Sequence, residues 1–200
     1  MITIGLTGGI GCGKSYVADK MKLRGIPVYD SDYRAKLLTS TNPVIKLELT
    51  RLVGPLLYCP CGCGVLQKDV LAKFIFGNPD NLAKVNAIIH PRVKEDFKQW
   101  ASTLKGKEFC ILESAILFES GFDSEVDFKV CVDAPLELRI QRCIKRDNTT
   151  REAVISRIEN QMDQVSKCMI SDFVIINDDV QPLEPQISAL MDKCKETFKL

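Results

Sequence analysis

A glycine-rich segment directly behind a short apolar run is the strongest constraint in the sequence. Residues 2–7 read Ile-Thr-Ile-Gly-Leu-Thr, and residues 8–15 read Gly-Gly-Ile-Gly-Cys-Gly-Lys-Ser, which fits the pattern G-x-x-x-x-G-K-[ST]. The glycines free the backbone to turn its N–H groups toward a phosphate at the start of the next helix. A turn that binds nothing is the alternative, but the strand, the glycines, Lys14 and Ser15 stand in the required order. The segment predicts binding of a nucleoside triphosphate, with Lys14 on the β- and γ-phosphates and Ser15 on Mg²⁺.

Length and charge narrow the class of protein. The 200 residues suffice for one domain of good size, or for a core with small inserts. Lys and Arg total 27 against 26 acidic residues, so no global field attracts nucleic acid or a membrane surface. The glycine-rich segment begins at residue 8, which leaves no room for a leader, and no apolar run has the length of a membrane span. We expect a cytoplasmic protein with small-molecule partners, no nucleic acid and no membrane; the oligomeric state stays open.

Nine cysteines raise the question of disulfides or metal. An odd count in a chain of this length does not favour a secreted disulfide scaffold. Cys59-Pro-Cys-Gly-Cys-Gly64 places three thiols close together, and Cys12, Cys168 or His90 could supply a fourth zinc ligand. Structural zinc sites usually have paired C-x-x-C spacings, which this segment lacks. We expect free thiols at Cys59, Cys61 and Cys63, with metal binding and redox activity left open.

Short apolar segments alternate with helical ones along most of the chain. The expected strands are residues 2–7, 26–29, 109–112, 128–132 and 173–176. The expected helices are residues 14–24, several within 33–105, and then 136–146, 149–164 and 183–199. Asn78-Pro79 and His90-Pro91 mark expected helix boundaries, since a residue before proline avoids the α region. This alternation predicts an α/β fold, with a five-stranded parallel sheet and helices on both faces.

Two carboxylate positions at expected strand ends suggest chemistry. Asp30-Ser31-Asp32 follows the second strand, and Glu113 follows the third. Ligands of open α/β sheets bind beyond the carboxyl ends of the strands, beside the phosphate-binding loop. We therefore interpret Asp32 as the base that accepts the proton of an attacking hydroxyl, and Glu113 as a carboxylate that holds the water shell of Mg²⁺. The alternative for residues 30–32 is an ordinary turn.

Three arginines with helical spacing form a second cluster. Arg139, Arg142 and Arg146 are three and four residues apart, so they share a helix face and could grip phosphate oxygens from a mobile lid. A solvated face paired with Asp147 and Glu152 is the alternative. His90, the only histidine, is either a structural residue or a contact to substrate phosphate.

The ordered set of motifs resembles the dephospho-CoA kinase family across nearly the whole chain. The motifs that carry the resemblance are Thr7-Gly-Gly-Ile-Gly-Cys-Gly-Lys-Ser15, Asp30-Ser-Asp32, His90-Pro91, Leu117-Phe-Glu119, Arg146-Asp147 and Asp172-Phe-Val-Ile-Ile-Asn177. The resemblance implies Mg²⁺-assisted transfer of the ATP γ-phosphate to the 3′-hydroxyl of dephospho-CoA, the last step of coenzyme A synthesis. It also implies a three-layer P-loop kinase fold similar to that of the nucleoside monophosphate kinases. The implied domains are a core of residues 1–32, 106–138 and 165–200, a helical CoA-side domain of residues 33–105, and a lid of residues 139–164.

The resemblance also assigns residues to roles. Asp32 would lie by the acceptor hydroxyl, Arg146 and Arg142 would contact ATP from the lid, and Asn177 would fall near the adenine. The predicted catalytic residues are Lys14, Asp32 and Arg146, and the predicted metal ligands are Ser15 and Glu113. The residues predicted to bind ATP are Gly9, Gly11, Cys12, Gly13, Lys14, Ser15, Tyr16, Arg142, Arg146 and Asn177.

The chain departs from the family pattern at three places. Ala115 stands where a proline is usual, and Asp178 and Asp179 stand where a glycine often follows the asparagine. The thiols of residues 59–64 stand where the family usually has a short polar turn.

Two other functions remain to be weighed. One is a different P-loop kinase that acts on a nucleotide or a sugar. The other is a nucleotide-dependent switch without an acceptor. The sequence has no N-K-x-D segment of the GTPases, and Asp32 with the arginine face argues against a switch.

Overall fold

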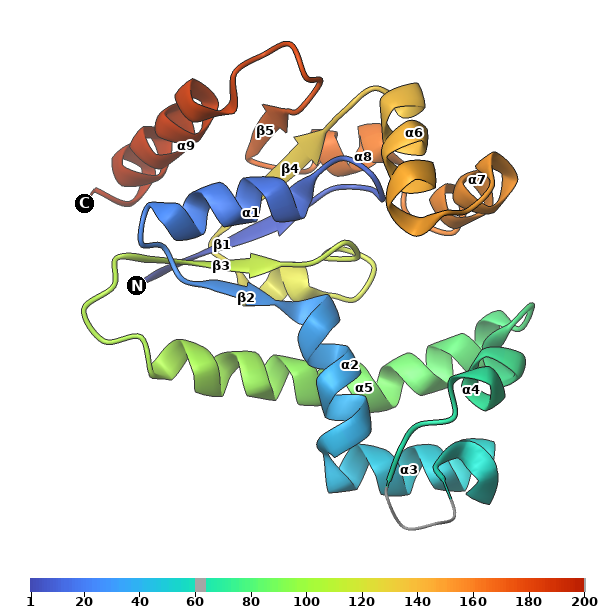
Figure 1. Cartoon of the computed structure of the whole chain (residues 1–200). Helices are drawn as coiled ribbons and strands as arrows, with labels where there is room; N and C mark the ends of the chain where they lie inside the picture. The colour runs from blue at the N-terminus through green and yellow to red at the C-terminus, as the bar shows by residue number, and fades with distance from the viewer. Residues whose placement is uncertain (60–63, 200) are drawn as a thin grey trace. The chain divides into compact units, whose positions relative to one another are not determined.

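The computed structural model describes residues 1–59 and 64–199, and the chain divides into two compact units. One unit comprises Met1–Asp30 together with Leu104–Leu200, and the other comprises Ser31–Thr103. The first unit contains the sheet, and the second is built from helices (Figure 1). No helix in the described ranges has both the length and the apolar character needed to span a bilayer.

The first unit is built around a five-stranded parallel sheet, as the sequence predicts. Its strands are β1 (Ile2–Thr7), β2 (Val28–Asp30), β3 (Phe109–Glu113), β4 (Phe128–Asp133) and β5 (Phe173–Ile176). Their order across the sheet is β2-β3-β1-β4-β5, and every neighbouring pair is parallel. β1 therefore lies in the middle, which suits its nearly continuous burial.

Helices pack against both faces of this sheet. α1 (Lys14–Leu23) and α9 (Leu183–Phe198) share one core cluster with the side chains of Ile4, Leu6 and Val130. Gly5 alternates with Ile4 and Leu6, and its missing side chain would point at Leu117 and Val126 beyond the opposite face. α8 (Gln164–Met169) approaches that opposite face, where Cys168 contacts Cys131 of β4.

Two further helices complete this unit, together with the short 3₁₀ turn Phe122–Glu125. α6 (Leu136–Asp147) follows β4, and α7 (Arg151–Glu159) begins at a Thr150 cap whose side chain accepts a hydrogen bond from the Ala153 N–H. The prediction of one helix over residues 149–164 is wrong, because the chain turns between α7 and α8, where the Asp163 side chain caps the new helix. A fresh N-cap of this kind satisfies N–H groups that a continuous helix would have bonded itself.

The second unit consists of helices around a small core. They are α2 (Ser31–Thr41), α3 (Pro43–Val53), α4 (Lys68–Ile75) and α5 (Pro79–Ser102), with a 3₁₀ turn at Pro55–Leu57. Asn42 and Asn78 cap α3 and α5, each directly before a proline at the first helical position. Ile45, Leu49, Leu57 and Val85 form the buried centre.

The sequence analysis made predictions about two helix boundaries and about the cysteines of this unit. The boundary at Asn78-Pro79 is confirmed, but the boundary at His90-Pro91 is wrong, since Pro91 lies inside α5. Proline removes one helical hydrogen bond, yet α5 packs along α2 and α3, and this tertiary packing outweighs the local penalty. The expectation for Cys61 and Cys63 falls outside the described residues. The described ranges contain no cluster of three potential metal ligands.

The pKa of His90 can be measured directly, because it is the single histidine of the chain. Burial and the nearby Lys94 ammonium both lower the pKa of His90 below 6.5. We expect the imidazole proton resonance of His90 to titrate in NMR spectra with a midpoint below that value. Because its pKa is lower in the folded chain, the unfolded chain binds the proton more readily. Protonation of His90 therefore lowers the free energy of unfolding as the pH falls from about 7 to below the pKa of the folded chain. A midpoint at or above 6.5 would contradict the expectation.

Candidate functional site

The glycine-rich loop of residues 8–13 connects the central strand β1 to α1. Gly11 and Gly13 have φ angles of +83° and +86°, which L side chains rarely adopt. There is also no room for a Cβ atom, which would collide with the Arg139 backbone at Gly11 and with the Asn177 side chain at Gly13. The loop therefore requires glycine at both positions, as a backbone cradle does.

The loop delivers the start of α1 to the carboxyl edge of the sheet. Gly13 is the N-cap residue of α1, and because it has no side chain it cannot accept a capping hydrogen bond. No acidic residue lies in the first turn of the helix. The N–H groups of Lys14, Ser15 and Tyr16 thus form the positive end of the helix dipole. Such a helix start binds anions, and phosphate oxygens in particular.

A hydroxyl and a carboxylate meet beside this helix start. Ser15 Oγ donates a 2.7 Å hydrogen bond to Glu113 Oε1. Glu113 is the last residue of β3 and is buried, and Asp30 lies opposite it at the end of β2. Oxygen donors of this kind are the ligands that Mg²⁺ prefers. The structure thus brings together the two residues that the sequence predicts as metal ligands, and their donor set fits that ion.

Asn177 lies against the loop from the end of β5. Its side-chain Nδ2 donates a 2.8 Å hydrogen bond to the Cys12 carbonyl, and its backbone N–H donates to the Asp133 carbonyl at 2.7 Å. The side chain is 6% exposed. Asn177 therefore holds the phosphate-binding loop itself, and a contact to adenine stays a prediction.

The structure separates the three arginines that the sequence placed together. Arg139 is 4% exposed, and its Nε donates a 3.0 Å hydrogen bond to the Ile10 carbonyl, so it is not the exposed lid cation that its spacing suggested. Arg142 donates to the Asn177 carbonyl at 3.0 Å and pairs with Asp179 at 2.6 Å. Arg146 is largely exposed and pairs with Asp147. Helical spacing indicated that these residues are neighbours on α6, but it could not indicate that Arg139 points toward the glycine-rich loop.

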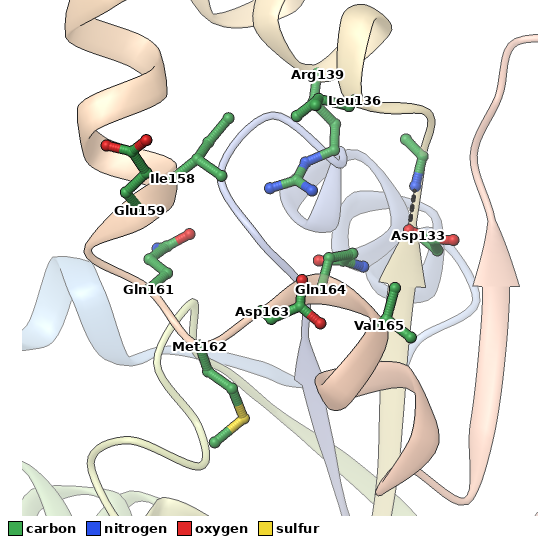
Figure 2. A pocket seen from close by; sticks show the side chains of 11 residues that line it. Asp133, Leu136, Arg139, Ile158, Glu159, Gln161, Met162, Asp163, Gln164 and Val165 are labelled. Carbon is green, nitrogen blue, oxygen red and sulfur yellow. Dashed lines mark hydrogen bonds between the residues drawn. The ribbon is translucent and has the colours of Figure 1, made fainter.

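Two glutamines that the sequence analysis missed also contact the loop. The Gly9 N–H donates to Gln164 Oε1 at 2.8 Å, and the Ile10 N–H donates to Gln161 Oε1 at 2.9 Å. Both glutamines line a pocket of about 580 Å³ together with Arg139 and residues of α6, α7 and α8 (Figure 2). No local pattern marks them, because their partners lie more than 150 residues away in the chain.

A buried ion pair anchors the segment that carries these glutamines. Lys167 of α8 is fully buried, and its Nζ lies 2.8 Å from Glu119 Oε1 and donates to the Ala115 carbonyl at 2.7 Å. Glu119 Oε1 also accepts the N–H of Met162 at 2.9 Å. The pair thus fixes the turn between α7 and α8 to the segment after β3.

Asp32 lies in the first turn of α2, at the start of the second unit. The residues expected as a strand-end turn therefore have two different structures, because Asp30 ends β2 and the helix begins at Ser31. The dipole of α2 favours a negative charge in its first turn.

Comparison with known proteins decides among the kinase and switch alternatives. A family model described as dephospho-CoA kinase matches residues 2–182. A dephospho-CoA kinase from Bacteroides fragilis is 48% identical over 190 residues, which cover 95% of this chain and 91% of that protein. The chain belongs to the dephospho-CoA kinase family.

Solved structures agree with this assignment. A Thermus thermophilus protein is similar with a TM-score of 0.82 and 33% identity, covering 98% of this chain and 97% of that one. The dephospho-CoA kinase from Campylobacter jejuni has a TM-score of 0.68 at 20% identity, with 98% of both chains covered, and shares the fold. The predicted family, fold class and enzymatic activity are thereby confirmed: the chain is a kinase of the family that phosphorylates dephospho-CoA to coenzyme A.

The buried pair in this dephospho-CoA kinase gives a test of stability. Replacing Lys167 by Met keeps the volume but leaves the Glu119 carboxylate and the Ala115 carbonyl without their cation. We expect the free energy of unfolding to fall by about 2–4 kcal/mol, less than for a fully buried pair because Glu119 is 24% exposed. Denaturant unfolding of the variant is the measurement.

Lys193→Met is the matched control. The Lys193 Nζ donates to the Asp172 carbonyl at 2.9 Å from an exposed position, so we expect a loss of about 1 kcal/mol or less. Equal losses in the two variants would mean that the buried pair of Lys167 and Glu119 contributes no more to the free energy of unfolding than an exposed hydrogen bond does.

Proposed function

We propose that this kinase transfers the γ-phosphate of ATP to the 3′-hydroxyl of dephospho-CoA at the start of α1. The observation that carries the proposal is the Ser15–Glu113 hydrogen bond of 2.7 Å beside an uncapped helix N-terminus at the end of the glycine-rich loop. A phosphate cradle and a pair of oxygen ligands for a divalent cation therefore lie side by side. The site of action that suits these substrates is the cytoplasm, where ATP is supplied.

The proposed roles of the loop residues follow from their chemistry. The N–H groups of Gly11, Cys12, Gly13, Lys14, Ser15 and Tyr16 are proposed to cradle the β-phosphate, with Gly9 shaping the entry to the loop. The Lys14 ammonium neutralises charge on the transferred phosphoryl group. Ser15 and Glu113 would hold Mg²⁺, which would neutralise negative charge on the phosphate groups during transfer.

We assign the acceptor side to the second unit. The compact unit Ser31–Thr103 is proposed to act as the CoA-side domain, which the sequence analysis placed at residues 33–105, and Asp32 in the first turn of α2 is proposed as the base. Its carboxylate accepts the proton of the attacking hydroxyl, which makes the oxygen a better nucleophile as the bond to phosphorus forms.

Replacement of Asp32 by Asn tests this role while keeping the size of the side chain. We expect kcat for coenzyme A formation to fall by about 10²–10⁴, with little change in ATP affinity. Product formation would be followed with ATP and dephospho-CoA, and ADP release without acceptor would be measured in parallel.

Asp80→Asn is the control for this variant, since Asp80 lies in the first turn of another helix of the same unit. We expect its kcat to stay at the wild-type value. A rise in the Michaelis constant for dephospho-CoA alone in Asp32→Asn would make Asp32 a binding residue and not the base.

We further propose that residues 139–164 act as the lid. Both ends of this segment are anchored in the first unit, through Arg139 at one end and Gln161 with Gln164 at the other. Between these anchors lie Arg146, Asp147 and α7, whose Val154 packs in one buried cluster with Ile140 and Cys143 of α6. We propose that this stretch moves when the lid closes. Closure over ATP and dephospho-CoA would exclude water from the γ-phosphate and bring Arg146 onto it.

Hydrogen exchange measures this closure directly. We expect amides of residues 147–160 to gain protection when ATP and dephospho-CoA are both present. Arg146→Ala should lower kcat more than it weakens ATP binding, because its contact strengthens as charge develops. Lys145→Ala removes an exposed positive charge one position away and should leave kcat unchanged. Equal protection with and without ligands would mean a rigid charged face.

A further inference from the structure

The first residues of the phosphate-binding loop are bonded through their backbone by three side chains from distant parts of the chain. Gln164 accepts from the Gly9 N–H at 2.8 Å, Gln161 accepts from the Ile10 N–H at 2.9 Å, and Arg139 donates to the Ile10 carbonyl at 3.0 Å. We propose that Gln161 and Gln164, with Arg139, are positioning residues for phosphoryl transfer, which hold the loop in its phosphate-binding shape. We name these three side chains the loop clamp.

The clamp explains a glycine that backbone geometry does not require. Gly9 is absent from the glycines with positive φ, so an L residue could adopt its conformation. A Cβ atom at Gly9 would nevertheless run into the Arg139 guanidinium and would lie 2.9 Å from Gln164 Oε1. A side chain at position 9 would therefore displace the Arg139 guanidinium and the Gln164 amide, so the clamp in this arrangement requires glycine there.

The clamp residues are themselves held in place. Gln164 Nε2 donates to the Val132 carbonyl at 3.0 Å, so the one amide group bridges the loop after β1 and the end of β4. The turn that carries Gln161 and Gln164 is fixed by the bond from the Met162 N–H to Glu119 and by the Asp163 cap of α8. A support fixed in this way can define the position of the loop, because its own groups have few alternative conformations.

The three clamp residues line a pocket, so their contacts are not part of a solid core. Figure 2 shows Arg139 on α6, Gln161 on the connection between α7 and α8, and Gln164 at the start of α8, and all three line the pocket of about 580 Å³. When one of the glutamines is shortened or made apolar, water can reach the N–H group that it bonded. We therefore expect substitutions here to change the local conformation of the loop and to leave the fold intact.

The consequence for catalysis follows from the order of residues in the loop. Gly9 and Ile10 immediately precede Gly11–Tyr16, the part proposed to cradle the phosphates. A glycine-rich backbone has many accessible conformations, and phosphoryl transfer depends on positioning to within about 1 Å. Bonds at Gly9 and Ile10 remove that freedom before ATP arrives, so ATP does not have to order the loop on binding.

The test uses apolar replacements of similar length in the full chain. We expect Gln164→Met and Gln161→Met each to raise the Michaelis constant for ATP by about three- to tenfold, in line with the loss of one hydrogen bond to the loop backbone. The double variant should exceed either single one and also lower kcat, while the Michaelis constant for dephospho-CoA stays near its wild-type value. This kinetic arm rests on the proposed binding of ATP at the loop.

A spectroscopic arm is independent of activity. In the wild-type chain without ATP we expect slow hydrogen exchange at the Gly9 and Ile10 amides. Gln164→Met should speed exchange at Gly9 first, and Gln161→Met at Ile10 first. This pattern would test the clamp even if the proposed catalytic roles proved wrong.

Gln186→Met is the matched control. Gln186 makes a similar two-bond bridge, to the Ile176 N–H at 2.8 Å and the Ile176 carbonyl at 2.9 Å, and Asn177 has separate bonds of its own. We expect this variant to lose a comparable amount of stability without a change in the ATP parameters. Wild-type ATP kinetics in the double clamp variant, or the same kinetic loss in Gln186→Met, would overturn the proposal.

Discussion

The position of β1 in the middle of a parallel sheet is the constraint on which the site depends. Because β3 and β4 pair with β1 on its two sides, their carboxyl ends lie beside the loop that leaves β1. β3 thereby supplies Glu113 to Ser15, and β4 supplies the Val132 carbonyl that orients Gln164. A strand at the edge of the sheet would have one such neighbour and could not be supported from both sides.

The side chains that support the loop bond to its backbone groups. The N–H groups of Gly9 and Ile10 and the carbonyls of Ile10 and Cys12 are each bonded by a side chain, while the N–H groups at the start of α1 have no side-chain cap. Side chains thus bond the N–H groups of Gly9 and Ile10, whereas no side chain caps the N–H groups at the start of α1. This division suits a binding loop, since groups used for restraint are not available to a phosphate.

The sequence predicts those parts of the site that depend on local patterns. The loop, Lys14 and Ser15 follow from one motif, and Glu113 follows from its place after an apolar strand. The meeting of Ser15 and Glu113 could be expected because parallel strands bring their ends to one edge. Arg139 was misjudged because helical spacing gives the neighbours of a residue and not the direction of its face. Pro91 was misjudged because packing of α5 outweighed a local penalty, and Gln161 and Gln164 carry no local signal.

The bond from Asn177 to Cys12 joins residues separated by 165 positions. When only the first two thirds of the chain have been synthesised, the glycine-rich loop is present, but β5, Gln161 and Gln164 are not. Contacts of such long range form late, because much of the chain must be ordered before they close. The hydrogen bonds that restrain the loop in the folded chain therefore form only after β5 and the turn with Gln161 and Gln164 have been synthesised.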